Sequence, residues 1–243
     1  MSGWPIAENL ARIHERIAGA CARAGRRPEE VTLLAVSKTF PAEAIRAAYT
    51  LGIRHFGENR VQEFEAKRAA LTGLSDAVWH LIGHLQGNKA RRALQLFHRV
   101  DSVDSIALAQ RLARAAEERR KPAEKLPVLI EVRLADEDTK SGVAPEELPA
   151  LLESVRALPQ LELRGLMCIP PMFDDAERAR PYFRRLRELR DELRVRLSSN
   201  REPRASNLDV LSMGMSHDFA VAIEEGATEI RVGTALFGSR KAP

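Results

Sequence analysis

Cysteine is scarce in this chain, and so are aromatic residues and long apolar runs. The 243 residues include two cysteines, Cys21 and Cys168, which are far apart and lack the spacing of metal ligands. This scarcity argues against a disulfide framework and against a zinc site. No apolar stretch is long enough to cross a bilayer, and the segment over 6–27 is amphipathic and charged, unlike a signal peptide. We therefore expect a soluble protein of the reducing cytoplasm with no membrane partner.

Neither sign of charge dominates the composition. The chain has 38 Lys and Arg residues against 34 Asp and Glu, a formal net charge of +4, and the excess is spread along its length. A diffuse excess of this size predicts no nucleic-acid partner. Arginine is most frequent in a helical segment over 174–197. Acidic residues are interleaved there, which predicts ion pairs at i,i+3 and i,i+4 on a solvated face.

Apolar residues make up 44% of the chain and form alternating strand-like and helix-like segments after an opening helix over 6–24. The strand-like segments are Val31–Ser37, Ile53–Glu58, Val78–Gly83, Arg99–Ser102, Val128–Leu134, Leu163–Ile169, Val210–Met213 and Glu229–Phe237. The helix-like segments between them are Pro41–Thr50, Arg60–Ala70, Lys89–Leu96, Ser105–Arg120, Pro145–Ala157, Asp174–Leu197 and His217–Glu225.

Strands that are each joined to the next by a helix predict a closed parallel barrel or a doubly wound sheet. Eight strands close a TIM barrel, and the length of this chain fits that fold. No repeat or shift in composition marks a second domain. We therefore expect an α/β fold with one domain, a TIM (β/α)8 barrel over about 31–238 with an additional N-terminal helix over about 6–24.

One lysine stands at the end of the first expected strand. Lys38 follows the apolar run Val31–Ser37, and Pro41 comes soon after it. Burial at such a position disfavours the charged form, and a lysine with a lowered pKa has the free amine that Schiff-base chemistry needs. The alternative is a strand-end lysine whose ammonium group lies in solvent.

Small and hydroxyl-bearing residues end the seventh and eighth expected strands. They are Ser212, Met213 and Gly214 on the seventh, and Gly233 and Thr234 on the eighth. In TIM barrels the loops after these two strands commonly form a phosphate site. Each segment alone also fits an ordinary turn. Together with a lysine on the first strand, they favour a site for a phosphorylated ligand.

Arg231 alternates with its apolar neighbours on the last strand, so its side chain lies on the opposite face of that strand. An inward guanidinium in a barrel needs a specific partner, because a permanent buried cation is costly. A ring nitrogen would serve. A core carboxylate such as Glu131 or Glu58 would serve equally well.

Polar side chains also end the second and third expected strands, where Asn59, His80 and His84 are found. His80 and His84 do not predict a metal site, because four residues on a strand span roughly 13 Å, too far for one ion. His80 either faces the barrel mouth or makes structural hydrogen bonds in the core.

Seven runs of residues carry a family resemblance. They are AVSKTFP, HFGENRVQE, WHLIGHLQGNKA, TKSG, GLMCIPP, LSMGMSHDF and EIRVGTALFGSR, which extend in order from residue 35 to 240. They resemble the pyridoxal phosphate homeostasis protein family, which is similar to the N-terminal barrel of alanine racemases and related fold-type III enzymes. Two mild departures are Arg60, where tyrosine is often seen, and His217 at a variable helix start.

The resemblance implies pyridoxal 5′-phosphate (PLP) as cofactor. By that resemblance Lys38 forms the internal aldimine, and Arg231 faces the pyridine nitrogen. The same resemblance assigns the remaining pocket residues as Ser212, Gly233 and Thr234 at the phosphate, Met213 and Gly214 nearby, and Asn59 and His80 along the wall.

Turnover is not expected. An arginine at the pyridine nitrogen disfavours ring protonation and so weakens the electron sink. Racemases with this arginine use a tyrosine from a second domain as the opposing base. We expect no such domain here, and the two tyrosines, Tyr49 and Tyr182, fall in helical segments.

We therefore expect a monomeric PLP-binding protein of vitamin B6 and amino-acid homeostasis, with apo PLP-dependent enzymes as recipients of the cofactor. The first alternative is a fold-type III amino-acid racemase or lyase with His80 or another rim group as base. The second is a barrel enzyme in which Lys38 attacks the carbonyl of a phosphorylated sugar.

Overall fold

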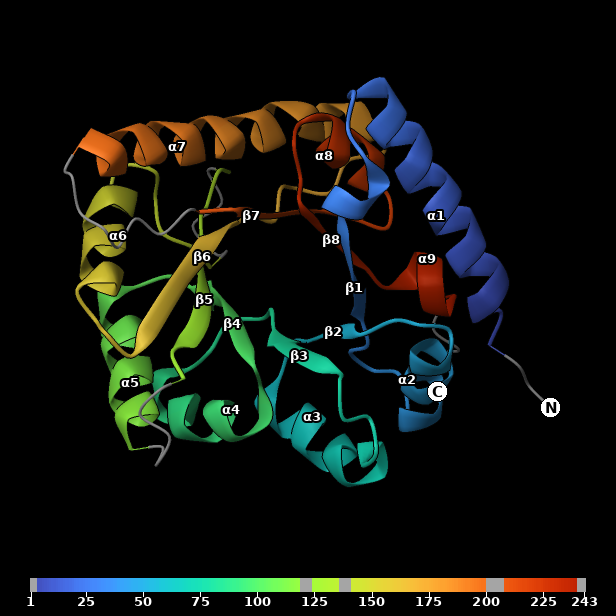
Figure 1. Ribbon diagram of the computed structural model, residues 1–243, viewed down its shortest axis with the longest axis horizontal. Coiled ribbons are helices and arrows are strands. Elements are labelled where there is room, and N and C mark those ends of the chain that lie inside the picture. The colour runs from blue at the N-terminus through green and yellow to red at the C-terminus, as the bar shows by residue number, and fades with distance from the viewer. Residues whose placement is uncertain (1–3, 119–123, 136–140, 200–207, 240–243) are drawn as a thin grey trace.

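The computed structural model describes residues 4–118, 124–135, 141–199 and 208–239, and a closed barrel of parallel strands lies at its centre (Figure 1). The strands are β1 (Thr32–Val36), β2 (His55–Glu58), β3 (Val78–Leu81), β4 (Arg99–Val103), β5 (Leu126–Glu131), β6 (Leu161–Met167), β7 (Val210–Met215) and β8 (Glu229–Val232). Each strand pairs in parallel with its neighbours in sequence, and β1 pairs with β8. The predicted TIM (β/α)8 barrel is confirmed.

Helices connect the strands and surround the barrel (Figure 1). The α-helices are α1 (Ile6–Arg23), α2 (Ala42–Thr50), α3 (Val61–Arg68), α4 (Ala90–Leu96), α5 (Ile106–Glu117), α6 (Leu148–Arg156), α7 (Arg180–Ser199), α8 (Phe219–Glu224) and α9 (Thr234–Phe237). Short 3-10 turns are η1 (Pro28–Glu30), η2 (Ala69–Leu71), η3 (Gly87–Lys89) and η4 (Ala176–Ala179). No helix in these ranges is long and apolar enough to cross a membrane.

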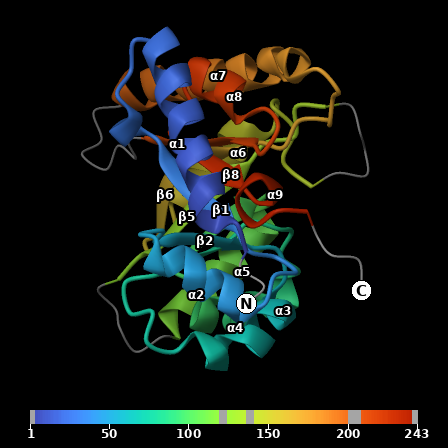
Figure 2. The same cartoon turned by 90° about the vertical axis from the view of Figure 1, so that its right-hand side faces the viewer.

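The predicted N-terminal helix is α1, which packs beside α8 and α9 on the outside of the barrel (Figure 2). Its large buried side chains follow helical spacing: Ile6, Leu10, Ile13 and Ile17. Asn9, on the same helix, donates from Nδ2 to the carbonyl oxygen of Leu236 in α9 at 2.8 Å. The helix therefore holds the segment that follows the last strand.

The barrel interior is tight beside β2. Leu34, Val36 and Ile82 form a small buried cluster separate from the main core between strands and helices. A Cβ at Gly57 would lie 2.4 Å from Leu34 Cδ2 and 3.0 Å from Ile82 Cδ1. Glycine at this position therefore allows the interior side chains to meet.

Most strands differ from the sequence-based expectation by one or two residues at an end, and the last and fifth strands differ more. The last strand was expected to reach Phe237, but β8 ends at Val232, and the amides of Leu236 and Phe237 donate to the carbonyl of Gly233 to start α9. The fifth strand was expected to reach Leu134. β5 ends at Glu131. Beyond this point the Arg133 amide donates to the carbonyl of Val143, and the Val143 amide donates to the carbonyl of Glu131.

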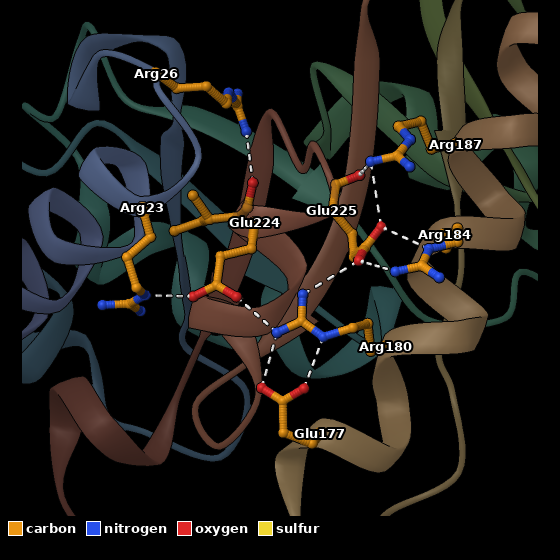
Figure 3. Close-up of polar contacts among 9 residues, drawn as sticks. Arg23, Arg26, Glu177, Arg180, Arg184, Arg187, Glu224 and Glu225 are labelled. Carbon is orange, nitrogen blue, oxygen red and sulfur yellow. Dashed lines mark hydrogen bonds and ion pairs between the residues drawn. The ribbon is translucent and has the colours of Figure 1, made fainter.

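The arginine-rich helix also differs from expectation. A 3-10 turn, η4, precedes α7, and several arginines bond to another helix rather than along their own (Figure 3). Arg180, Arg184 and Arg187 all lie within 3.2 Å of the Glu225 carboxylate, which follows α8. Arg180 also pairs with Glu224 at 2.6 Å. Pairs at the predicted i,i+3 spacing, such as Arg180 with Glu177 at 2.7 Å, form only part of the pattern.

Candidate functional site

The closed barrel brings the predicted site residues of three strands to one rim. The order β7, β8, β1 places the ends of these strands next to one another. Lys38 follows β1 and is partly buried, while Arg231 lies near the end of β8, in register with Leu34 of β1. Ser212, within β7, is fully buried beneath the same rim.

Arg231 is a buried cation whose hydrogen bonds go to neutral acceptors. It is 3% exposed, and it donates from Nη1 to Ser212 Oγ at 2.9 Å and from Nη2 to the Cys168 carbonyl oxygen at 2.8 Å. Neither Glu131 nor Glu58, the carboxylates considered from the sequence, forms an ion pair with it within the described ranges. A guanidinium has five N–H donors, so Arg231 retains the capacity to bind a further acceptor. This arrangement fits a ligand that presents a ring nitrogen.

Ser216 contacts the turn after β8, although the sequence interpretation selected Ser212. Ser216 Oγ accepts hydrogen bonds from the amides of Gly233 and Ala235, each at 3.2 Å. Thr234 begins α9 and is exposed. The signal for Ser216 was present in the run LSMGMS, but choosing between its two serines requires knowing how β7 turns at its end.

The other two predicted residues of β7 have structural roles in the fold. Met213 packs in the main core outside the barrel interior. Gly214 has φ +91°, and a Cβ there would lie 2.6 Å from the Cβ of Ala222. The glycine therefore lets α8 approach the end of β7 closely.

The turn that carries Lys38 rests on a network centred on Lys67 of α3. The Lys67 ammonium group lies 3.1 Å from the carbonyl oxygen of Ser37 and 3.3 Å from that of Phe40, on the two sides of Lys38. It also pairs with Glu58 Oε1 at 2.8 Å and with Glu63 Oε1 at 3.2 Å. The partly buried ammonium group thus fixes both ends of the short turn around Lys38.

The two carboxylates of this network complete the support. Glu58 is fully buried and also accepts from Ser37 Oγ at 2.7 Å. Burial raises its pKa, although Lys67 and Ser37 oppose the shift. Glu63 accepts from the amide of Thr39, a non-glycine residue with φ +67°. Burial opposes the ionisation of Glu63, but the bonds from Thr39 and Lys67 hold its pKa below the usual value.

Aromatic contacts link this turn to both ends of the chain. The Phe40 ring lies 5.6 Å from the ring of Trp4 and 4.7 Å from that of Phe237 in α9. The Lys38 turn is therefore packed against the segment that follows β8 as well as against α3.

Asn59 lines a cavity of about 330 Å³ at the ends of β2, β3, β5 and β6. Its polar lining also includes His84, Glu131 and Arg133. Burial raises the pKa of Glu131 to about 7, opposed by the positive charge of Arg231. The sequence interpretation weighed Glu131 only as a partner of Arg231, although a carboxylate within the apolar run of β5 is itself a signal of an inward polar group.

His80, predicted to line the cofactor pocket, lies in a buried network inside the barrel. Its Nε2 is 3.0 Å from His55 Nδ1, and its Nδ1 is 3.5 Å from Asp101 Oδ2. Arg99 joins Asp101 and Glu229, each at 2.5 Å. Burial would raise the pKa of Asp101, but Arg99 and His80 hold it well below its usual value. These contacts match the structural alternative for His80.

The sequence matches a known family and curated relatives along almost its whole length. The family described as alanine racemase, N-terminal domain, matches residues 8–241. The pyridoxal phosphate homeostasis protein of Aquifex aeolicus is 49% identical over 234 residues, covering 96% of this chain and 98% of the relative. That of Escherichia coli K12 is 42% identical over 242 residues, covering 97% of each.

Solved structures share the fold. PipY of Synechococcus elongatus PCC7942, with PLP bound, superposes with a TM-score of 0.79 at 45% identity and covers 93% of this chain and 100% of its own. An alanine racemase of Clostridium difficile, in complex with cycloserine, gives a TM-score of 0.69 at 15% identity over 97% of this chain and 60% of its own. At that identity the second likeness concerns the fold alone.

Proposed function

Since the chain belongs to the pyridoxal phosphate homeostasis protein family, we propose that it binds PLP covalently through Lys38 and serves intracellular PLP and amino-acid homeostasis without catalytic turnover. PipY, at 45% identity, has been solved with PLP bound. The observation in this chain that carries the proposal is the buried Arg231 guanidinium, which has neutral partners and donors to spare.

Each part of the ligand finds suitable residues at the rim. Lys38 supplies the primary amine for the carbonyl carbon, and Arg231 donates toward the pyridine nitrogen. Thr234 offers its backbone amide and hydroxyl to the phosphate, and Ser216, whose Oγ accepts from the Gly233 amide, has a hydroxyl hydrogen to donate. Ser212 orients Arg231 from below. Bound PLP supplies a carbonyl that reacts reversibly with amines and a ring that withdraws electrons from them.

The surroundings of the two tyrosines support binding without turnover. Tyr49 bonds to Asp76 on the outer side of the barrel, and Tyr182 lies against Phe173. Both tyrosines thus have partners outside the rim site, which supports the absence of a racemase-type opposing base. A guanidinium donor also keeps the pyridine nitrogen unprotonated, which limits carbanion stabilisation. We propose further that the protein is a monomer and that apo PLP-dependent enzymes receive the cofactor.

A PLP-dependent racemase or lyase is the second candidate, and Glu131 is the observation that favours it. A carboxyl with a pKa near 7 in a cavity beside Asn59 has the properties of a general acid or base. Deuterium exchange at Cα, followed with each amino acid, separates the two functions. Rapid exchange that requires Lys38 would establish the enzyme.

The absorption spectrum of the purified protein tests the binding proposal. We expect a near-visible band after addition of PLP, and borohydride should fix the cofactor onto the peptide containing Lys38. Lys38→Ala should lack this band, whereas Lys125→Ala, a change at an exposed lysine, should keep it. If the wild-type protein takes up no PLP, the proposal fails at its central residue, and a phosphosugar substrate becomes the better hypothesis.

A further inference from the structure

A second part of the barrel mouth is built differently from the rim around Arg231. The cavity of about 330 Å³ lies over the ends of β2, β3, β5 and β6, and no residue of β7 or β8 within the described ranges lines it. Its volume is at the lower end of small-molecule sites. The space therefore suits a ligand about the size of an amino acid.

Glu131 is a buried carboxylate at this cavity, and one of its two oxygens has no hydrogen-bond partner among the described residues. Its residue is 6% exposed, and its Oε2 atom is buried and bonds to no group in the described part of the chain. A buried carboxylate that lacks a partner loses the hydration it would have in water. The same side chain lines the cavity, so a ligand placed there would reach it.

Charged and titratable groups from several strands lie near Glu131. They are Arg231 on β8, His84 after β3, Asp104 after β4 and Cys168 after β6, and Arg133 after β5 lines the same cavity. His84 is already engaged with Asp104 at 3.0 Å, and Arg231 with Ser212 and Cys168. The protein thus leaves the charge of Glu131 without a bonded cation.

We propose that this cavity binds the primary ammonium group of a small molecule, with Glu131 as its carboxylate partner. An ammonium group supplies both the charge and the hydrogen-bond donors that Glu131 lacks. The Asn59 amide and the Ser141 hydroxyl line the same space and offer neutral acceptors for the remaining N–H groups. An anion would be opposed by Glu131 and Asp104. The inference rests on the cavity and Glu131. Because Asn59 is also assigned to the wall of the PLP site, amine binding has to be measured on protein free of PLP, where the result does not depend on PLP binding.

Binding of the ammonium group is linked to the ionisation of Glu131. Burial raises the pKa of this carboxyl to about 7, so it is mostly protonated at pH 6 and mostly ionised at pH 8. An alkylammonium ion keeps its charge throughout this range. The affinity should therefore rise about tenfold from pH 6 to pH 8.

Carbon NMR of the full chain, freed of any bound carbonyl compound and labelled at the glutamate carboxyl carbons, tests the proposal directly. The Glu131 signal is identified as the one lost in Glu131→Gln. The pH midpoint of its titration should lie above the midpoints of the other glutamates. Methylammonium chloride should lower this midpoint, by about one pH unit at ten times its dissociation constant. Sodium chloride at the same ionic strength should not.

Variants separate a bound cation from a general salt effect. Saturation transfer from the protein to the methylammonium methyl group should be lost in Glu131→Gln. It should persist in Glu162→Gln, a matched change on β6 at an exposed carboxylate paired with Arg164. Circular dichroism verifies that both variants fold, and Glu131→Asp, which keeps the charge, should retain part of the signal. The proposal would be overturned if methylammonium and sodium shifted the Glu131 titration midpoint equally. It would also be overturned if saturation transfer to methylammonium were undiminished in Glu131→Gln.

Discussion

Individual side chains set the chemistry of this rim through partners that lie far from them in sequence. Lys67 illustrates this point, because it bonds to the carbonyl groups on both sides of Lys38 while it neutralises the buried Glu58. Arg231 and Glu131 illustrate the opposite case. Each is buried with a charge that no bonded protein group neutralises among the described residues.

Removal of the Lys67 ammonium group should destabilise the fold and loosen the Lys38 turn. We expect Lys67→Met to lower the free energy of unfolding by about 3 kcal/mol, because Glu58 is left buried without its cation. Urea denaturation measures this change. The double variant Lys67→Met with Glu58→Gln should lose much less free energy of unfolding than the sum of the losses in the two single variants. Additive losses would show that Lys67 and Glu58 are not coupled.

The ionisation of Glu131 should make the protein less stable as the pH rises. The pKa of this carboxyl is raised to about 7 in the folded state, so the folded protein binds the proton more tightly than the unfolded chain. Stability is therefore present in full below the unfolded pKa and decreases as the pH rises toward 7, by about 3 kcal/mol at most. Glu131→Gln should remove this part of the pH dependence and raise the melting temperature at pH 8. An unchanged profile from pH 5 to pH 8 would count against the burial of an ionised Glu131.

The outer helices of this barrel contact one another through a cluster of arginine–glutamate ion pairs as well as through apolar side chains. The carboxylate of Glu225 holds three arginines of α7, and Glu224 connects Arg180 to Arg23 of α1 (Figure 3). The cluster therefore joins α1 and α7 to α8. Its central carboxylate is buried, while the arginines at its edge are partly exposed.

Loss of the Glu225 charge should cost more than loss of any one of its arginines. We expect Glu225→Gln to destabilise the protein by about 2 kcal/mol, since it leaves three guanidinium groups close together without their carboxylate. Arg184→Ala, at a side chain that is 52% exposed, should cost less than about 1 kcal/mol. Chemical denaturation of both variants checks the order, and a larger loss in Arg184→Ala would refute it.

The elements themselves were largely predictable from the pattern of apolar residues. The run after Arg231 was the main exception, because Val232 to Phe237 is apolar with two small residues and fits a buried strand as well as a short helix. The rim residues on β1 and β8 were predictable because alternation fixes the face of a strand. The depth of His80 and Glu131 inside the barrel was not, because depth depends on how neighbouring strands are staggered, which no single strand encodes.

At the scale of the whole molecule, the chain closes on itself. β1 pairs with β8, and α1 covers the helices that follow β7 and β8. Trp4, Phe40 and Phe237 join the start of the chain, the Lys38 turn and α9 through ring contacts. These contacts favour one cooperative unit, as expected from the uniform composition of the sequence.

A single domain should unfold in one transition as seen from both of its tryptophans. Trp4 reports on the N-terminal segment, and Trp79 is buried in the main core. We expect Trp4→Phe and Trp79→Phe, each of which leaves one fluorophore, to give the same urea midpoint by fluorescence as by circular dichroism. In Trp79→Phe only Trp4 reports by fluorescence. A fluorescence midpoint at lower urea than the circular-dichroism midpoint of this variant would mean that α1 detaches before the barrel unfolds.

The pairing of β1 with β8 also has a consequence for synthesis on the ribosome. Lys38 is translated early, but Arg231 and the Gly233 turn are among the last residues of the barrel to be made. A nascent chain that carries Lys38 therefore has no opposing wall against which a ligand could be retained. The site comes into being only when the final strand joins the first, so a partly translated chain cannot withdraw ligand from the cell.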